Sequence, residues 1–288
     1  MDAEVFPAQP PPLGRRVLLR QRWSQVSFLH WRVDPALVAR HMPPGCTPDL
    51  IDGSAWIGLI AFQMSDSAFL RGPRIPWLGD FPEVNVRLYS IDSLGRRGVV
   101  FLSLEASHLL PVLFARAVFG LKYQWASMSI HGRGPTDGTT DPTADGPIDG
   151  TADGSTDGST DGELTYRTRR IGHPAARSRI TVQSLEPFAP EPGGAEDRIA
   201  TGLTARWAFH QAHLGRTLYC RNHHESWSLH RARLVSLDDH LLRAAGFGDL
   251  AERPPDSVLT ASPVDTVFAA PSRLPRRPAR GHADGPST

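Results

Sequence analysis

The chain has 288 residues, a formal net charge of +1 at pH 7, and hydrophobic and charged fractions of 40% and 21%. These values are typical of a globular protein with a sizeable core. The small net charge gives no global field that would attract nucleic acid or an anionic membrane. No apolar stretch approaches the length of a membrane span, and the amino terminus lacks the pattern of a secretory signal. We therefore expect a cytoplasmic, bacterial-type protein without nucleic-acid or membrane partners.

The twelve histidines do not form a recognisable metal-binding motif. The closest groups are His210 with His213 and the adjacent pair His223 and His224. Neither group has the glutamate and third ligand of a hydrolytic zinc motif, so we expect surface or hydrogen-bonded histidines and no metal. No glycine-rich phosphate loop or nucleophile elbow is present, and the sequence predicts no cofactor.

The first half of the chain predicts a succession of strands. Residues 1–14 are rich in proline and are expected to be disordered. Asp34 and Pro35 are typical of the start of a short helix. We expect strands over residues 21–31, 55–64, 83–89 and 96–106, a helix over 109–120 and a strand over 123–130.

The second half continues the pattern after an unusual insert. Residues 134–162 repeat Asp-Gly units with almost no apolar side chains, which predicts a disordered expansion of a hairpin loop. The apolar pattern that calcium-binding nonapeptide repeats need is missing. We expect strands over 163–171 and 178–186, a helix over 196–213, two strands within 216–237, a helix capped by Asp238 and a strand near 258–268.

Strands with irregularly interspersed helices indicate an α+β protein built on a large antiparallel or mixed sheet. Nothing in the pattern marks a domain boundary. We expect one domain over residues 15–271, with a disordered tail over 272–288 that is rich in proline and arginine.

One strand carries a polar face. Between Glu83 and Tyr89 the polar residues Glu83, Asn85 and Arg87 alternate with three apolar residues. Such a face lies either toward solvent or into a polar cavity. In a cavity, Arg87 would bind a carboxylate and Glu83 would act as an acid or base. Strand parity could add Ser103 and Glu105 to the same lining.

The chain resembles the YqjF-like family of uncharacterised bacterial proteins. The resemblance runs from about Trp23 to Phe268 and rests on ordered segments: SFLHWRVDPALVARHMPPG, AWIGLIAF, PWLGDFPEVNVRLY, GVVFLSLEA, ARAVFGLKYQWASM, LTYRTRR and LYCRNHHESW. It implies a fold like that of acetoacetate decarboxylase, a curved antiparallel or mixed β-barrel or double sheet with flanking helices that encloses a pocket.

The resemblance also raises the question of a catalytic lysine. Acetoacetate decarboxylase forms a Schiff base through a lysine beside a second lysine, whereas this chain has one lysine, Lys122. The family alignment puts the catalytic lysine's place at Tyr123 and puts Lys122 where proline is usual. Arg87 or Arg116 could lower the pKa of Lys122, and a shift of about 4 units would be needed. Lys122 is thus a weak Schiff-base candidate, beside Glu83 as the acid or base and Asn85, Arg87, Arg116 and Tyr123 as binding residues.

Two functions stay open from the sequence. The protein is an enzyme on a small carbonyl or carboxylate compound, or it is a non-catalytic small-molecule-binding or structural protein that keeps the fold without the decarboxylase chemistry. Whether it is an enzyme, what its ligand is, and whether it forms a homo-oligomer are not decided by the sequence.

The insert provides the first test. Replacing residues 134–162 with a short Gly-Ser turn should leave the melting temperature nearly unchanged, because long loops add little closure entropy and this one has almost no apolar surface to bury. Differential scanning calorimetry of both proteins measures this. A large drop in melting temperature, or a new ordered signal on addition of calcium, would contradict the prediction.

Overall fold

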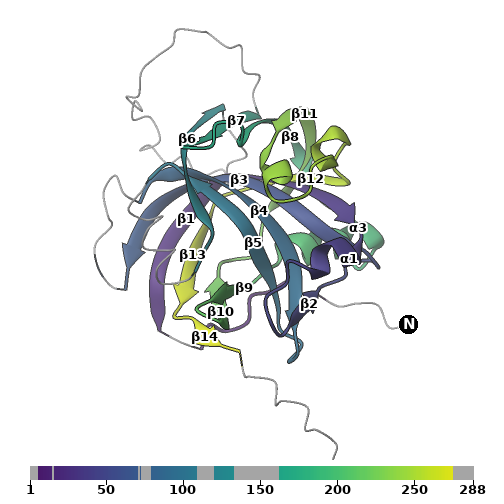
Figure 1. Ribbon diagram of the computed structural model, residues 1–288. Helices are drawn as coiled ribbons and strands as arrows, with labels where there is room; N and C mark the ends of the chain where they lie inside the picture. The colour runs from purple at the N-terminus through teal and green to yellow at the C-terminus, as the bar shows by residue number, and fades with distance from the viewer. Residues whose placement is uncertain are drawn as a thin grey trace, which may run out of the picture.

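The computed structural model describes residues 6–14, 16–70, 72, 79–108, 120–132 and 162–274. The expected helix over 109–120, apart from Gly120, lies outside these residues, as do Arg116, almost all of the insert and residues 275–288. The described part is dominated by one mixed sheet of fourteen strands (Figure 1). Its strands are β1 (Val17–Val33), β2 (Cys46–Pro48), β3 (Ala55–Phe69), β4 (Phe81–Asp92), β5 (Arg97–Ala106), β6 (Tyr123–Gly132), β7 (Glu163–Arg170), β8 (Arg177–Pro187), β9 (Ala208–His213), β10 (Arg216–His223), β11 (Leu229–Asp239), β12 (Ser257–Ala261), β13 (Val264–Ala269) and β14 (Ser272–Arg273). The helices in this part are α1 (Pro35–Ala39), α3 (Ala195–Thr204), α4 (Leu241–Ala244) and a 3₁₀ turn at Leu250–Glu252.

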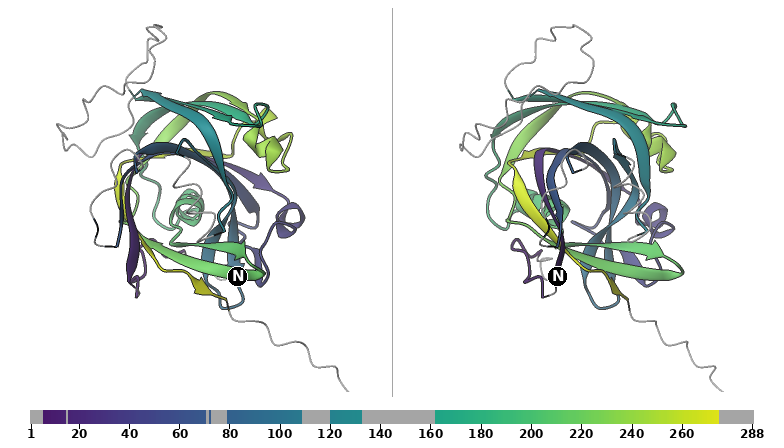
Figure 2. Two further views of the ribbon diagram at one scale, coloured as in Figure 1. Left: turned by 60° about the vertical axis from the view of Figure 1, so that its left-hand side comes forward. Right: turned by 90° about the vertical axis from the view of Figure 1, so that its left-hand side faces the viewer.

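The sheet curves back on itself (Figure 2). Its strand order runs β12-β11-β8-β7-β6-β5-β9-β10-β13-β1-β3-β4-β2, and the further pairings β1–β12 and β4–β5 join strands that are distant in that order. Two closed circuits of strands result. The first consists of β1, β3, β4, β5, β9, β10 and β13, and the second of β1, β3 to β8, β11 and β12. Pairing is antiparallel except at β5–β6 and β5–β9, which confirms the expected α+β class with a curved, largely antiparallel sheet.

Strands β3 and β4 belong to both circuits, which explains why the middle of the chain is so apolar. Along β3, Trp56, Ile60 and Phe62 belong to one core, and Ile57 and Leu59 belong to a second core. Successive side chains of a strand point to opposite faces, so a strand between two cores must be apolar on both. We call these cores the first and the second, after the circuits that enclose them.

Helix α3 lies inside the curve of the first circuit (Figure 2, left). Its buried residues Ala200 and Leu203 are part of the first core. The expected helix over 196–213 is wrong beyond Thr204. Ala205 leaves the helical conformation with ψ at 70°, and β9 then pairs with β10 across a tight turn in which Leu214 and Gly215 both have positive φ. Such a turn fits the twist of a hairpin, and hairpin pairing prevails over helical periodicity.

Other elements differ from expectation in detail. The strand expected near 258–268 is two strands, β12 and β13, because Ser262 and Pro263 interrupt the pairing. The carboxylate that caps α4 belongs to Asp239, which accepts a hydrogen bond from the Leu242 amide at 2.8 Å, and not to Asp238. At the insert, β6 and β7 pair directly with Gly132 opposite Leu164, as expected for a hairpin-loop expansion.

The amino-terminal segment packs against the sheet. The sequence predicts disorder for residues 1–14, whereas Phe6 is buried in the first core. The carbonyl groups of Pro7 and Ala8 accept hydrogen bonds from Trp207 and Ser226 at 3.0 and 2.6 Å. A proline-rich segment has few backbone donors, and side-chain donors from the segments before β9 and after β10 supply its hydrogen bonds instead. Within the described residues, no helix has the length and apolarity needed to cross a membrane.

Phe6 tests the contribution of this segment. Phe6→Ala should lower the free energy of unfolding by about 3 kcal/mol, because it opens a cavity against α3 and removes a ring from the first core. Urea denaturation measures the change. Leu94→Ala is the control, since Leu94 is 60% exposed and should change stability little. Equal stability of Phe6→Ala and the wild type would show that the segment does not contribute to the core.

Candidate functional site

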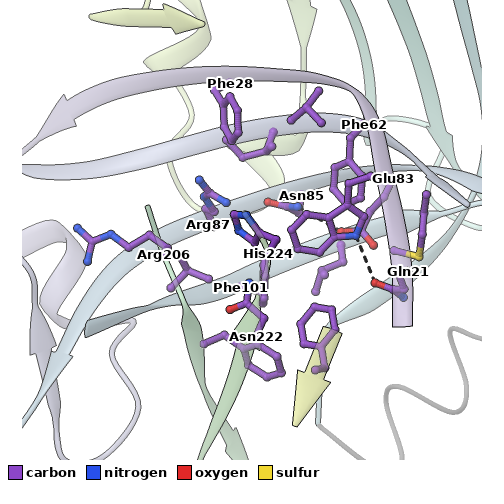
Figure 3. A pocket seen from close by; sticks show the side chains of 18 of the residues that line it. Gln21, Phe28, Phe62, Glu83, Asn85, Arg87, Phe101, Arg206, Asn222 and His224 are labelled. Carbon is purple, nitrogen blue, oxygen red and sulfur yellow. Dashed lines mark hydrogen bonds between the residues drawn. The ribbon is translucent and has the colours of Figure 1, made fainter. Parts of the chain in front are cut away.

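The first circuit encloses a cavity of about 100 Å³ (Figure 3). That volume exceeds the room needed for one water molecule several-fold, so the cavity suits a small organic molecule. The side chains around it are mostly aromatic and aliphatic, with a few polar groups among them. The lining residues on which the chemistry depends are Glu83, Asn85, Arg87, Tyr123, Arg206, Asn222 and His224, with Trp23, Phe28, Phe62, Phe101, Phe209, Trp227 and Phe268 as the aromatic walls.

The polar face of β4 lies in this cavity and not toward solvent. Glu83 and Asn85 are each 3% exposed. The alternate residues Val84, Val86 and Leu88 belong to the second core. The shared position of β4 therefore decides between the two alternatives that the sequence left open, and places Glu83, Asn85 and Arg87 along one wall of the cavity (Figure 3).

Glu83 is a buried carboxyl group in the cavity wall. Burial raises its pKa to about 7, although hydrogen bonds from Tyr123 and Asn85 oppose the shift. The Tyr123 hydroxyl donates to Oε2 at 2.7 Å, and the Asn85 amide donates to Oε1 at 3.2 Å. Burial, and then the charge of Glu83, hold the pKa of Tyr123 well above its ordinary value. Near pH 7 the carboxyl group can both accept and return a proton, as an acid–base catalyst must.

Arg87 lies along the same wall and keeps no acidic partner among the described residues. Its Nε donates to the Tyr89 hydroxyl at 3.1 Å, and Nη2 donates to the Leu203 carbonyl at 3.0 Å. The Leu203 carbonyl belongs to the last turn of α3, the negative end of the helix dipole. The guanidinium is thus oriented by neutral groups, and its charge stays available to an anion in the cavity.

A second cationic group, absent from the sequence predictions, adjoins Arg87. Arg206 is 6% exposed and pairs with Asp49, which also pairs with Arg97. The guanidinium carbon of Arg206 lies 5.0 Å from the Tyr89 ring centre, and that of Arg87 lies 5.5 Å from the same centre. Two guanidinium groups therefore adjoin this end of the cavity, and that of Arg87 has no acidic partner among the described residues. Only tertiary structure brings together positions 49, 97 and 206.

Strand parity also separates Lys122 from Tyr123. Tyr123 is buried and lines the cavity, whereas Lys122 is exposed. Lys122 therefore does not lie beside Glu83, and its place in the wall is taken by the tyrosine. Tyr123 contributes a phenol to this part of the cavity wall.

Ser103 and Glu105 do not join the lining. They pair in register with Val86 and Val84, so they lie on the second-core face of the sheet. Glu105 is held there by a bidentate ion pair with Arg170, at 2.6 and 3.1 Å. The alternation of residues along β5 suggested that Ser103 and Glu105 share the polar face of Glu83. The register between β4 and β5 places them on the opposite face of the sheet.

The sequence predicted a surface or hydrogen-bonded histidine at position 224. In the structure His224 is hydrogen-bonded, and it is also buried and lines the cavity. Its Nδ1 lies 2.6 Å from the Glu225 carbonyl, which can only accept, so Nδ1 carries the proton. Burial lowers its pKa to about 4, and the neutral ring keeps an unprotonated Nε2. The ring contacts Trp207 and Trp227, each at 4.7 Å between centroids. The described residues contain no group of three or more His, Cys, Asp or Glu suited to a metal ion.

Comparison with known proteins identifies the family. Residues 20–265 match the DUF2071 family, described as uncharacterized conserved proteins. The chain belongs to this family. It is 29% identical over 216 residues to the uncharacterized protein YqjF of Bacillus subtilis (strain 168), a match that covers 75% of this chain and 76% of YqjF.

Solved structures with the same fold are more distant in sequence. An acetoacetate decarboxylase-like enzyme from Sphingomonas wittichii RW1 superposes with a TM-score of 0.57 at 15% identity, covering 90% of this chain and 93% of that one. The enduracididine biosynthesis enzyme MppR, complexed with pyruvate, gives 0.56 at 15% identity over 92% and 91% of the two chains. Acetoacetate decarboxylase from Legionella pneumophila gives 0.54 at 12% identity over 96% and 92%. These likenesses confirm the acetoacetate decarboxylase-like fold of this DUF2071 member.

The pKa of Glu83 has a measurable consequence for stability. Because its folded-state pKa of about 7 exceeds the unfolded value of 4.5, the unfolded chain loses this proton first as the pH rises. The contribution of Glu83 to stability is therefore complete below about pH 4.5 and is lost as the pH rises to about 7. The loss amounts to about 3 kcal/mol.

Glu83→Gln removes this pH-dependent contribution to the free energy of unfolding. The free energy of unfolding of Glu83→Gln, relative to the wild type, should rise by about 3 kcal/mol between pH 4.5 and pH 8. Urea denaturation of both proteins across this range isolates Glu83 from the other titrating groups. Parallel pH profiles would mean that the carboxyl group titrates normally.

Proposed function

We propose that this protein is an enzyme that moves a proton on a small carbonyl or carboxylate compound, with Glu83 as the acid–base group. The observation that supports this most is the buried Glu83 carboxyl, hydrogen-bonded to Tyr123 and Asn85 and with a pKa of about 7. A group with a pKa near the working pH is the most effective proton-transfer catalyst.

The proposed step uses both ends of the polar wall. Glu83 removes a proton from the carbon next to the carbonyl group, and the C–H electron pair forms a carbon–carbon double bond as the oxygen becomes an enolate oxygen. Arg87 stabilises the negative charge, since its guanidinium lies on the same face and lacks an acidic partner among the described residues. Return of the proton from Glu83 restores the carbonyl compound.

A Schiff-base route is not part of the proposal. Such a route needs an amine in the cavity, and the chain has one lysine, whose side chain is exposed at position 122. The same fact favours the second candidate, a protein that binds a small molecule without converting it. We also propose a single domain over residues 15–271 in the cytoplasm, where the two free thiols of Cys46 and Cys220 would stay reduced.

Hydrogen–deuterium exchange distinguishes the two candidates. A panel of small ketones, oxo acids and 2-hydroxy acids is incubated with the protein in D₂O and followed by proton NMR. We expect enzyme-dependent loss of the signal next to the carbonyl group, and a loss of rate of about 100-fold or more in Glu83→Gln.

The matched control is Lys122→Arg, which should exchange at the wild-type rate. Borohydride treatment with an oxo acid should give no mass adduct at Lys122. Binding without exchange for every compound would support the non-catalytic candidate instead, and an adduct at Lys122 would restore the Schiff-base route.

A further inference from the structure

The cavity contains two hydrogen-bond acceptors that no described residue satisfies. Asn85 Oδ1 is buried without a partner, because the amide nitrogen of the same side chain is directed to Glu83. His224 Nε2 is unprotonated, as shown by the Nδ1 contact with the Glu225 carbonyl, and has no partner among the described residues. Both side chains line the cavity beside Arg87 (Figure 3).

Unsatisfied buried acceptors are costly unless a ligand supplies the donor. An acceptor removed from water loses its hydration, and native structures leave few such groups without a partner. Asn85 and His224 come from β4 and from the segment after β10, and both line the cavity, as does Arg87. Arg87 has no acidic partner among the described residues and can pair with an anion. The buried Asn85 Oδ1 lacks a donor, and His224 Nε2 can accept a hydrogen bond from an N–H or O–H group in the cavity.

We infer that the cavity binds a small carboxylate that carries a hydroxyl group on the adjacent carbon. The carboxylate pairs with Arg87, and the hydroxyl donates to Asn85 Oδ1 or His224 Nε2. The rest of the molecule contacts the aromatic walls, among them the stacked pair Trp23 and Trp227, 6.2 Å apart between ring centres. This inference deepens the proposed function, because it names the ligand class of the same cavity.

A neutral hydroxyl fits this place better than an ammonium group. Arg87 and Arg206 both lie beside the Tyr89 ring, and Arg87 has no acidic partner among the described residues, so the field next to Arg87 is positive. An ammonium on the adjacent carbon would lie in this field and be repelled. A carbonyl oxygen at the same position would meet two acceptors and form no hydrogen bond with them.

A matched series of four-carbon acids tests the inference by isothermal titration calorimetry. Butanoate, 2-oxobutanoate, 2-hydroxybutanoate and 2-aminobutanoate differ only at the second carbon. We expect 2-hydroxybutanoate to bind at least tenfold tighter than each of the others, because sites with buried polar groups discriminate strongly against ligands that leave them unpaired. Equal affinities, tightest binding of another member, or no binding by any of the four would overturn the inference.

Variants assign the subsites. Asn85→Leu and His224→Phe remove one acceptor each and should reduce the preference for the hydroxy acid while butanoate still binds. Arg87→Lys should weaken all four acids, since lysine lacks the planar fork that pairs with a carboxylate. Arg231→Lys is the matched control, because Arg231 lies on β11 with its side chain 40% exposed and pairs with Glu196. A preference unchanged in both acceptor variants would overturn the assignment, and melting curves confirm that each variant is folded.

Titration of Glu83→Gln separates this inference from the proposed catalysis. That variant cannot transfer the proton, so any exchange that it shows would not come from Glu83, whereas the affinities of the wild type alone decide the ligand class. A preserved preference without any exchange activity in the wild type would contradict the catalytic proposal alone. Exchange activity in the wild type with equal affinities across the series would contradict the ligand class alone.

Discussion

The burial of one face of β4 against an enclosed cavity is the constraint on which the site depends. A carboxyl group that leaves water loses several kcal/mol of hydration unless it is protonated or hydrogen-bonded. Glu83 combines both responses: Tyr123 and Asn85 donate to its oxygens, and its pKa rises to about 7. Apolar residues of the first core surround Glu83 on the cavity face of β4, and Val84 and Val86 border the second core on the other face. The two cores thus bury both faces of β4, and this burial raises the pKa of the Glu83 carboxyl group.

Strand β4 also keeps the carboxyl group of Glu83 apart from the guanidinium group of Arg87. The Cα atoms of Glu83 and Arg87 are about 13 Å apart along an extended strand, with Asn85 between them on the same face. Arg87 is oriented by the Tyr89 hydroxyl and the Leu203 carbonyl and not by Glu83. Because both side chains are long, they can approach from two sides a small anion that lies over Asn85, which is the basis of the proposed function.

The strands could be predicted well from the sequence. The residues that come together in the cavity could be predicted only in part. Alternation along residues 83–89 identified the polar wall, because period-2 patterns depend on the strand alone. The alternation could not show whether this polar face lies toward solvent or toward a cavity, because the direction depends on which strands pair with β4. Arg206 and His224 were missed for the same reason: each joins the cavity through partners far away in sequence. Phe6 was missed because a proline-rich composition indicates disorder unless distant segments supply hydrogen-bond donors, as Trp207 and Ser226 do here.

Tyr123 is the hydrogen-bond donor that lies closest to the Glu83 carboxyl group among the described contacts. Its hydroxyl lies 2.7 Å from Glu83, on the strand whose preceding residue is the single lysine of the chain. A phenol with a raised pKa remains protonated at neutral pH, so it can donate a hydrogen bond but cannot condense with a carbonyl group. A Schiff base needs an amine, and the described lining of the cavity contains the phenol of Tyr123 and no lysine. Arg87 and the hydrogen-bonded pair of Glu83 and Tyr123 therefore agree with the proposal of an anionic ligand handled by proton transfer.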